Sequence, residues 1–379
     1  MDLREIRSQF PHTSHRVYVN HAAVSPLSRA VRSAIGDHLT ERHGRSANAP
    51  IENFETVQPI LARAKRRAAD VLGAEASQVE FVTNTSSALN ILCRGLDWDE
   101  GDRVAVPDGS FPTNVYPFKN LRSEGVEVDL IPTQEGRYSV DDVARALQPE
   151  TRLLSVSWVH YLSGFRADLE DIGQLCRQRD VLFCVDAIQG LGALTLDVET
   201  AKVDFLAAGG HKWLMAPQGS GLLYCTEAVQ QRLQPPTGWL HGPVDWENLN
   251  HYQLTFHDDA RRFRTGTLNV MGIRALDAAL GLYLTVGRKS CEQKILDLAE
   301  RLTEGLQERG LTVYGSTDSR HASGIVTVVP DVPEALFDHL ESHGITAALR
   351  NRKLRFSPSY YNDASDLEAI FDAVDSFPK

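Results

Sequence analysis

Asp186 and Lys212 are the two residues of this sequence with the clearest potential for chemistry. Each follows a short apolar run, residues 181–185 (VLFCV) before Asp186 and residues 205–208 (FLAA), two glycines and a histidine before Lys212. Short apolar runs bounded by turn signals are typical of buried strands in a parallel sheet. A carboxylate and an amine at the ends of two such strands suit pyridoxal 5'-phosphate (PLP). The lysine forms a Schiff base with the aldehyde, and the aspartate keeps the pyridine nitrogen protonated.

Both residues also have plainer interpretations. A lysine after a turn is usually a surface residue, and an aspartate after a strand is often a helix N-cap. The apolar residues on both sides of Lys212 favour a lowered pKa, which frees its amine to attack a carbonyl. Because the two residues occur together, we predict that Lys212 and Asp186 are catalytic. Gln189 is either a solvent-facing turn residue or a donor to the phenolic oxygen of the cofactor.

The stretch TNTSS at residues 83–87 lies between an expected strand and an expected helix. Free backbone N–H groups at a helix start, together with hydroxyl groups, form an anion site. The alternative is an ordinary N-cap cluster, and the stretch alone does not decide between them. A phosphate-bearing cofactor on the same sheet favours the anion site, with Thr85 and Ser86 as its residues. The sequence has no GxGxxG motif and no Walker P-loop, so nucleotide binding has no motif support.

Four other side chains are candidates at the same edge of the sheet. Phe111, in a loop after an expected strand, is either a core residue or a ring that lies flat on the pyridine. His211 either contacts the phosphate or packs. Tyr161 follows another expected strand, and His21 follows a short N-terminal one; both are candidates for facing the substrate.

Arg355 lies in an expected strand near the C-terminus, within the sequence LRFSP. It is either an edge-strand charge that faces water or a guanidinium that binds a substrate carboxylate in a bidentate pair. Arg350 and Arg352 are rivals for the second role.

Strand and helix patterns alternate between residues 79 and 225, which predicts an α/β fold with a mostly parallel sheet between helices. Two stretches, residues 113–124 and 272–309, are each expected to be helical throughout. Residues 235–266 are rich in aromatic and turn residues and indicate an ordered connector. The tail from residue 324 has a strand, helix, strand, strand, helix pattern, as in a small α+β domain.

We therefore expect two domains. Residues 17–268 would form the large PLP-binding domain, and residues 1–16 and 269–379 the small domain. A chain of 379 residues is long enough for both.

Composition excludes several classes of protein. The net charge of −11 argues against a nucleic-acid-binding surface. The five cysteines show no metal-ligand spacing, so we expect no metal site and inert buried thiols, as in a reducing compartment. The N-terminus has no apolar signal region, and no apolar run is long enough to cross a membrane. We expect a cytoplasmic protein with a small-molecule substrate.

Asp186-Ala-Ile-Gln189 followed by His211-Lys212 resembles the signature of fold-type I PLP enzymes of the class V aminotransferase group. This group includes cysteine desulfurases, C–S lyases, isopenicillin N epimerase-like proteins and kynureninases. The resemblance extends from about residue 17 to residue 377. It implies that Lys212 is the Schiff-base lysine and Asp186 the partner of the pyridinium nitrogen.

The resemblance implies further roles. Thr85 and Ser86 match the phosphate-binding pair, and Phe111 looks like the ring-stacking aromatic of kynureninase-like members. The sequence RTGTLN at residues 264–269 resembles the segment through which a Gly-Thr pair, here Gly266-Thr267, reaches the phosphate of the neighbouring subunit's cofactor. A homodimer is therefore implied. Arg355 matches the carboxylate-binding arginine.

The sequence departs from the desulfurase pattern at three places. Gly209 stands where desulfurases have a serine, and Tyr161 where many relatives have an asparagine. No cysteine follows Cys291, although desulfurases have a persulfide-forming cysteine on a C-terminal loop. Residues 344–357 predict a tight turn with no room for that loop.

These observations predict a PLP-dependent enzyme that acts on an α-amino acid by aminotransferase-like or C–S lyase (β-elimination) chemistry. Racemisation and retro-aldol cleavage need the same Asp186 and Lys212 and stay open. A desulfurase without the loop cysteine and an amino-acid epimerase are alternatives. A PLP-binding protein without turnover is the alternative from outside the enzymes.

Overall fold

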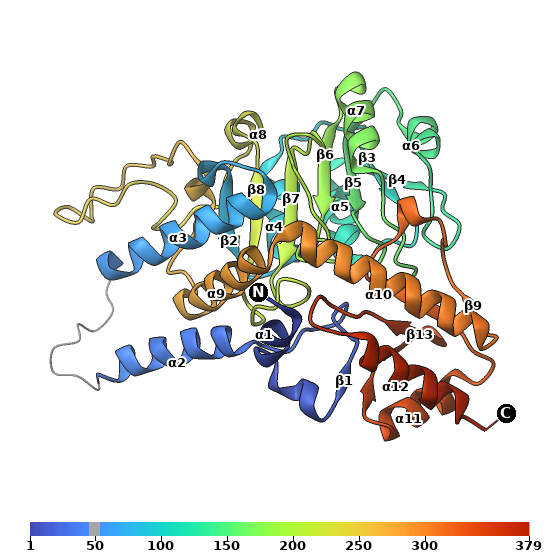
Figure 1. Cartoon of the computed structure of the whole chain (residues 1–379). Helices are drawn as coiled ribbons and strands as arrows, with labels where there is room; N and C mark the ends of the chain where they lie inside the picture. Colours follow the sequence, from blue (N-terminus) through green and yellow to red (C-terminus); the bar gives the residue numbers. More distant parts are fainter. Residues whose placement is uncertain (45–53, 379) are drawn as a thin grey trace.

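The structure, a computed structural model, describes residues 1–44 and 54–378. Its centre is a seven-stranded sheet (Figure 1) with the strand order β2-β8-β7-β6-β5-β3-β4. The strands are β2 (Val79–Val82), β3 (Arg103–Pro107), β4 (Glu127–Ile131), β5 (Thr151–Ser157), β6 (Leu182–Asp186), β7 (Phe205–Gly209) and β8 (Gly221–Cys225). The strand β8 runs antiparallel to the other six strands. The predicted α/β fold with a mostly parallel sheet is confirmed.

Alternating side chains of the central strands enter two different cores. In β6, Phe183 and Val185 belong to one apolar cluster and Cys184 to the other. In β7, Leu206 points to the first cluster and Phe205 to the second. This alternation follows from the two-residue period of a strand. It explains why both strands are apolar throughout: helices cover both faces of the sheet.

The helices divide between these two faces. The first cluster includes residues of α3 (Phe54–Leu72), α7 (Leu169–Arg179) and α9 (Val270–Val286). The second includes residues of α4 (Thr85–Gly95), α5 (Tyr116–Lys119) and α8 (Glu227–Arg232). The helix α6 (Val140–Ala146) lies beside α7 and β4. The carboxyl ends of β6 and β7, with Asp186 and the turn to Lys212, therefore lie between helical layers.

A four-stranded antiparallel sheet with the order β12-β13-β10-β9 forms the C-terminal unit. Its strands are β9 (Thr312–Val313), β10 (Val326–Val329), β12 (Ala348–Arg350) and β13 (Lys353–Phe356), and its helices are α10 (Arg288–Glu308), α11 (Pro333–Ser342) and α12 (Ala364–Asp375). A third apolar cluster lies between this sheet and these helices. In Figure 1, α10 runs between the large sheet and this unit. The expected α+β tail is present.

The N-terminal segment joins the two units. It contains α1 (Leu3–Ser8), β1 (Val17–Tyr18) and α2 (Arg29–His43). The strand β1 pairs in parallel with β11 (Ile345–Thr346) of the C-terminal unit, while α2 packs against α9. The helix α9 in turn shares a core with the large sheet. The domain boundaries at residues 17 and 268 stay a prediction.

Two expectations about helices are wrong. Residues 113–124 form the 3-10 helix η3 (Pro112–Asn114), α5 and the 3-10 helix η4 (Asn120–Glu124) in place of one helix. Pro117 cannot donate a backbone hydrogen bond, which disfavours a continuous helix. Residues 272–309 form two helices, α9 and α10, because Gly287 between them has a φ of 100°.

Two short 3-10 helices, η1 (Pro11–Ser14) and η2 (Ala76–Gln78), precede β1 and β2, and two others, η5 (Ala260–Phe263) and η6 (Ser319–His321), lie in later connections. In residues 1–44 and 54–378 no single helix is long and apolar enough to cross a membrane. The pair α9 and α10 passes that test only jointly, with a bend of 80° between the helices.

Candidate active site

A cavity of about 430 Å³ brings most of the predicted site residues together. Its lining includes Thr85, Ser86, Phe111, Tyr161, Gln189, His211, Lys212 and Arg355. These residues come from the start of α4, from loops after β3, β5, β6 and β7, and from β13. A ligand in this cavity would touch both the large sheet and the C-terminal unit. A larger cavity of about 490 Å³ near the start of α7 contains none of the predicted residues.

Lys212 lies in the turn that follows β7, where the Met215 N–H donates to its carbonyl. Burial, aided by the positive charge of Arg355, lowers the pKa of the Lys212 amine to about 8. The Asp186 carboxylate acts in the opposite direction but does not offset the burial. The Lys212 Nζ also lies 5.8 Å from the centre of the Phe111 ring. The amine is thus a stronger nucleophile near neutral pH than an ordinary lysine.

This lowered pKa predicts how Lys212 reacts as pH changes. Below pH 8 the amine is mostly protonated, and above pH 8 it is mostly the free base. In protein stripped of any cofactor, the rate at which trinitrobenzenesulfonate modifies Lys212 should therefore reach half its maximum near pH 8. Peptide mass spectrometry at a series of pH values measures this rate, with the exposed Lys119 as an internal reference. Modification of Lys212 in parallel with Lys119 over the whole range would contradict the prediction.

Asp186, the last residue of β6, is 3% exposed. Its Oδ1 accepts a hydrogen bond from the Ile188 N–H at 3.1 Å. Burial raises the pKa of the carboxyl to about 6, although that hydrogen bond and Lys212 both oppose the rise. Within the part of the chain that the structure describes, Asp186 has no ion-pair partner. A buried carboxylate of this kind fits a cationic ring nitrogen as its missing partner.

Gln189 lines the cavity, and its amide is held by the protein. Its Nε2 donates to the Ala22 carbonyl at 3.0 Å, and its Oε1 accepts from the Trp213 indole at 3.0 Å. An amide nitrogen carries two hydrogens, so one remains for a further acceptor. The predicted contact with the cofactor's phenolic oxygen stays a prediction.

The first turn of α4 forms one wall of the cavity. Asn84 is the N-cap, and its side chain accepts from the Ser87 N–H at 2.8 Å. Thr85 Oγ accepts from the Gly209 N–H at 3.0 Å, and Ser86 Oγ lies 3.0 Å from Thr113 Oγ. The first N–H groups of a helix have no acceptor within the helix, and the helix dipole favours an anion beside them. This wall therefore has the donor chemistry that a phosphate needs.

Arg355 is 3% exposed, yet no carboxylate pairs with it among the described residues. Its Nη1 donates to the Tyr161 carbonyl at 2.6 Å, and its Nε has no hydrogen-bond partner. Burial, aided by Arg350, lowers the pKa of the guanidinium to about 10. A buried cation without a counter-charge is costly. Arg355 therefore has the features of a site for an anionic group.

The two rival arginines differ in position. Arg350 also lines the cavity, whereas Arg352 pairs with Glu334 at 2.9 Å and its side chain is 71% exposed. Phe111 is 44% exposed, which excludes the core interpretation, and its ring makes an edge contact with Tyr161 at 5.3 Å. His211 lines the cavity, and burial lowers the pKa of its ring.

Three predicted residues do not line the cavity: Asp186, which is buried at the end of β6, His21 and Thr267. His21 is fully buried, and both nitrogens of its ring are hydrogen-bonded within the protein. Thr267 lines two other cavities, and Arg264 lines both of them as well. Arg264 Nε lies 3.0 Å from the buried carboxylate of Glu80, which also binds Lys65. This ion cluster fixes the start of the segment that carries Thr267.

Sequence analysis did not name five of the lining residues as candidates. Ala22 and Ala23 follow His21, Asn84 precedes Thr85, and Ile188 precedes Gln189, so each lies within two residues of a predicted one. Thr113 lies two residues after Phe111, and its hydroxyl in a strand-end loop was a usable signal. The small, apolar residues carry no chemical signal of their own.

Known proteins resemble this chain over nearly its whole length. The model of the family described as Aminotransferase class-V matches residues 17–368. A protein of Methanothermobacter thermautotrophicus named probable cysteine desulfurase is 28% identical over 331 residues, which cover 86% of this chain and 81% of the relative.

Two solved structures share the fold. The apo structure of a cysteine desulfurase from Thermococcus onnurineus NA1 has a TM-score of 0.88 at 23% identity and covers 97% of this chain and 96% of that one. The cystine C-S lyase C-DES, in complex with its reaction product cysteine persulfide, has a TM-score of 0.90 at 22% identity and covers 98% of this chain and all of that one. With the family model matching most of the sequence, the chain belongs to the class V aminotransferase family of enzymes, which use PLP.

Proposed function

We propose that this protein is a PLP-dependent enzyme that cleaves a C–S bond of an α-amino acid by β-elimination. The observation that carries the assignment to a PLP enzyme acting on an amino acid is that Lys212 and Arg355 line one cavity. Lys212 offers an amine with a pKa near 8, and Arg355 offers a buried guanidinium without a carboxylate partner. An aldehyde cofactor needs the first, and the carboxylate of an amino acid needs the second.

The described residues fit PLP. Lys212 would hold its aldehyde carbon, and the start of α4, with Thr85 and Ser86, would hold its phosphate. Asp186 would pair with the ring nitrogen. The ring of Phe111 and the side chains of Gln189 and His211 line the same cavity and complete the set. When bound, PLP supplies an electron sink for negative charge at the Cα of the substrate.

The chain's own residues supply orientation and proton transfer. Arg355 binds the substrate carboxylate and thereby fixes which bond at Cα is oriented for cleavage. Lys212, once its amine is free, accepts the proton from Cα and can return it to a leaving sulfur or to carbon. Phe111 and Tyr161, whose rings meet edge to face at 5.3 Å, form an aromatic wall of the cavity.

The positions of the cysteines favour a lyase over a desulfurase. A desulfurase needs a cysteine thiolate that attacks the substrate sulfur, whereas β-elimination needs only a base and a leaving group. All five cysteines of the chain are buried, and none lines the cavity. Burial raises the pKa of Cys93, Cys176, Cys184 and Cys291 to about 12. It also raises the pKa of Cys225 well above its usual value.

The connection between β12 and β13 also lacks space for a cysteine loop. It is a tight turn in which Asn351 and Arg352 have φ values of 47° and 56°. Such a two-residue turn brings the strands directly together. The similarity of C-DES, which is named a cystine C-S lyase, supports the same assignment. A desulfurase is the second candidate, because relatives such as the Methanothermobacter protein are named probable cysteine desulfurases.

A product assay decides between these reactions. The protein with PLP is incubated with cysteine, with cystine and with a panel of other amino acids. Pyruvate with a sulfur-containing product indicates β-elimination, and alanine with persulfide or sulfide indicates desulfuration. A keto acid that forms only with an amino acceptor indicates transamination. Alanine as the main product from cysteine would overturn the proposed lyase activity.

Arg355→Gln should raise KM for amino-acid substrates about 10–100-fold, because a hydrogen bond between charged groups contributes about 1.5–3 kcal/mol. Arg352→Gln is the matched control and should leave KM unchanged, since Arg352 is exposed and pairs with Glu334. Steady-state kinetics on both variants measure the effect. An unchanged KM in Arg355→Gln, with a raised KM in Arg350→Gln, would transfer the role to Arg350.

We further propose that the protein is a homodimer in which Gly266-Thr267 reaches the phosphate of the other subunit's cofactor. Support comes from the position of Thr267, outside the cavity of its own chain and on a segment anchored by Glu80. Sedimentation analysis tests the dimer. Mixing inactive Lys212→Ala subunits with inactive Thr267→Ala subunits tests the shared site, because hybrid dimers would regain one intact site.

A further inference from the structure

The strand that carries Arg355 is tied to the N-terminal segment through Ser357. The Ser357 N–H donates to the Val19 carbonyl at 2.6 Å, and the Ala22 N–H donates to Ser357 Oγ at 3.0 Å. The His21 N–H donates to the Ser357 carbonyl at 3.3 Å. Ser357 lies two residues beyond Arg355, so these bonds hold the end of β13 against residues 19–22.

The His21 ring adds a bond whose direction is fixed. Its Nδ1 lies 2.7 Å from the Ser357 carbonyl, and a carbonyl only accepts, so Nδ1 carries the hydrogen. Burial lowers the pKa of His21 to about 3, so the ring is neutral and Nε2 is an acceptor. Nε2 lies 2.7 Å from the Tyr361 hydroxyl, which must therefore donate to it.

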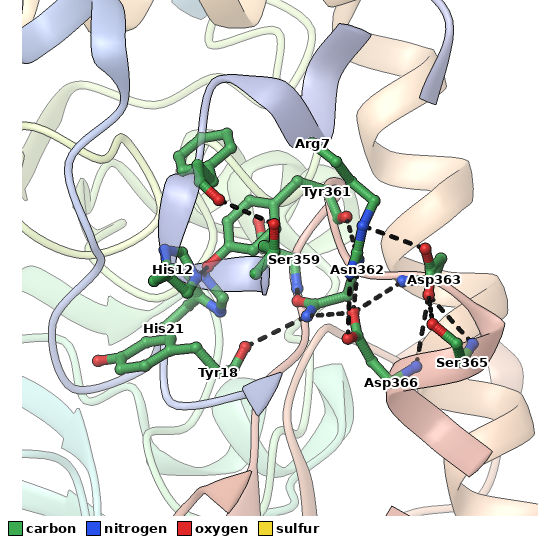
Figure 2. Close-up of polar contacts among 12 residues, drawn as sticks. Arg7, His12, Tyr18, His21, Ser359, Tyr361, Asn362, Asp363, Ser365 and Asp366 are labelled. Atoms are coloured by element: carbon green, nitrogen blue, oxygen red, sulfur yellow. Dashed lines mark hydrogen bonds and ion pairs between the residues drawn. The ribbon is translucent and has the colours of Figure 1, made fainter. Parts of the chain in front are cut away.

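The chain of hydrogen bonds continues outward to His12 (Figure 2). Because the Tyr361 O–H donates to His21, its oxygen accepts from His12 Nε2 at 3.2 Å. The Tyr361 backbone is held as well, since Arg7 donates to its carbonyl at 3.0 Å and pairs with Asp366 at 2.7 Å. In this chain of hydrogen bonds, His12 donates to Tyr361, Tyr361 donates to His21, and His21 donates to the Ser357 carbonyl. Each donor thus points toward the strand of Arg355.

His21 also lies close to residues of the opposite wall of the cavity. Its neighbour Ala22 lines the cavity, and the Ala22 carbonyl accepts from Gln189 Nε2. Trp213, which follows Lys212, donates to Gln189 and lies 6.0 Å from the His21 ring, centre to centre. His21 therefore lies between the element that presents Arg355 and the elements that present Gln189 and Lys212.

We propose that His21 and Tyr361 are positioning residues, which set where the Arg355 guanidinium lies relative to Lys212 and thereby the affinity for the substrate carboxylate. The proposal rests on the proposed function, in which Arg355 binds that carboxylate. His21 acts through its Nδ1–H bond to Ser357, and Tyr361 acts by keeping the hydrogen on Nδ1. Neither residue lines the cavity, so neither touches the substrate.

Three variants separate the contributions of the ring nitrogens. His21→Leu removes both bonds. His21→Asn keeps a donor at the position of Nδ1, because both nitrogens lie three bonds from Cα. Tyr361→Phe keeps the ring, which stacks on Phe10 at 4.1 Å between centres, and removes only the hydroxyl. Tyr360→Phe is the matched control, since Tyr360 is equally buried but takes no part in this chain of hydrogen bonds.

Each variant is assayed for PLP affinity, for kcat and KM with cystine, and for the inhibition constant of cystamine, the analogue without carboxylates. In His21→Leu we expect KM for cystine to rise about tenfold or more, because small displacements of a binding group are costly. PLP affinity and the inhibition constant of cystamine should stay close to wild type. His21→Asn should restore KM, Tyr361→Phe should raise it, and Tyr360→Phe should not change it.

Several outcomes would overturn the proposal. A wild-type KM for cystine in both His21→Leu and Tyr361→Phe would contradict it directly. An equal loss for cystine and cystamine would show a general structural role in its place. If His21→Leu does not fold, the comparison of Tyr361→Phe with Tyr360→Phe decides the same question. A wild-type protein that binds no PLP would overturn the proposed function itself, which distinguishes the two failures.

Discussion

Replacing Lys212 with alanine is expected to lower kcat about 10³-fold or more, because a positioned acid–base group alone contributes about 10²–10⁴ to the rate. Lys212 is also the only lysine that lines the cavity in the described part of the chain, so its loss would remove the covalent anchor as well. Turnover of the best substrate from the amino-acid panel, measured with saturating PLP, gives the effect.

Two controls make this result specific. Lys212→Arg keeps a positive charge but has no amine of lowered pKa, so it should be as inactive as Lys212→Ala. Lys119→Ala removes an exposed lysine of α5 and should leave activity unchanged. Retention of a tenth or more of the wild-type kcat in Lys212→Ala would show that another group moves the proton at Cα.

Asp186→Asn should have the second-largest effect. The amide has the same shape and can still accept from the Ile188 N–H, but it carries no charge to keep a ring nitrogen protonated. We expect kcat to fall about 10²–10³-fold, in line with the loss of a charge-stabilising group in an active site. PLP affinity should fall much less, because the other contacts to the cofactor remain. Kinetics at saturating PLP and a PLP titration separate the two quantities.

The pH profile provides an independent check on Asp186. Burial raises the pKa of this carboxyl to about 6, so its negative charge is present above pH 6 and is lost as pH falls through that value. A cationic ring nitrogen beside it would lower that pKa below 6. Wild-type kcat should therefore fall at or below pH 6 through this group, and the residual activity of Asp186→Asn should lack that step. The same acid limb in both proteins would assign it to another residue.

Local sequence was sufficient to predict the positions of Asp186 and Lys212. Asp186 ends β6 and Lys212 follows β7, both strands are apolar on both faces, and such strands end at a common edge of a parallel sheet. The same reasoning located Phe111, Tyr161 and the start of α4 at one cavity. Catalytic candidates at the ends of strands can be predicted from sequence, because the apolar run of each strand shows where the strand ends.

Contacts between distant segments could not be predicted in this way. The partners of Gln189 are Ala22 and Trp213, and those of His21 are Ser357 and Tyr361, all of them set by tertiary packing. The sequence around His21, a histidine after a short strand, does not indicate whether its side chain faces the cavity or lies behind the residues that line it.

Breaks within helices were also missed. Residues 113–124 have a helical pattern, yet they form two 3-10 helices with the short α5 between them, and α9 ends just before Gly287. Pro117 and Gly287 could have been used to predict these breaks, because proline disfavours a helix interior and glycine often ends a helix. The proposed role of Thr267 is of another kind, because a single copy of the chain does not test it.

The central claim is that Lys212 holds PLP, and borohydride trapping tests it most directly. The purified protein is incubated with PLP, its visible absorption is recorded, and the complex is reduced with borohydride, digested and mapped by mass spectrometry. We predict a visible band that is absent from Lys212→Ala and a pyridoxyl group on the peptide that contains Lys212. A wild-type protein that stays colourless after addition of PLP, or a pyridoxyl group on a different lysine, would contradict the claim.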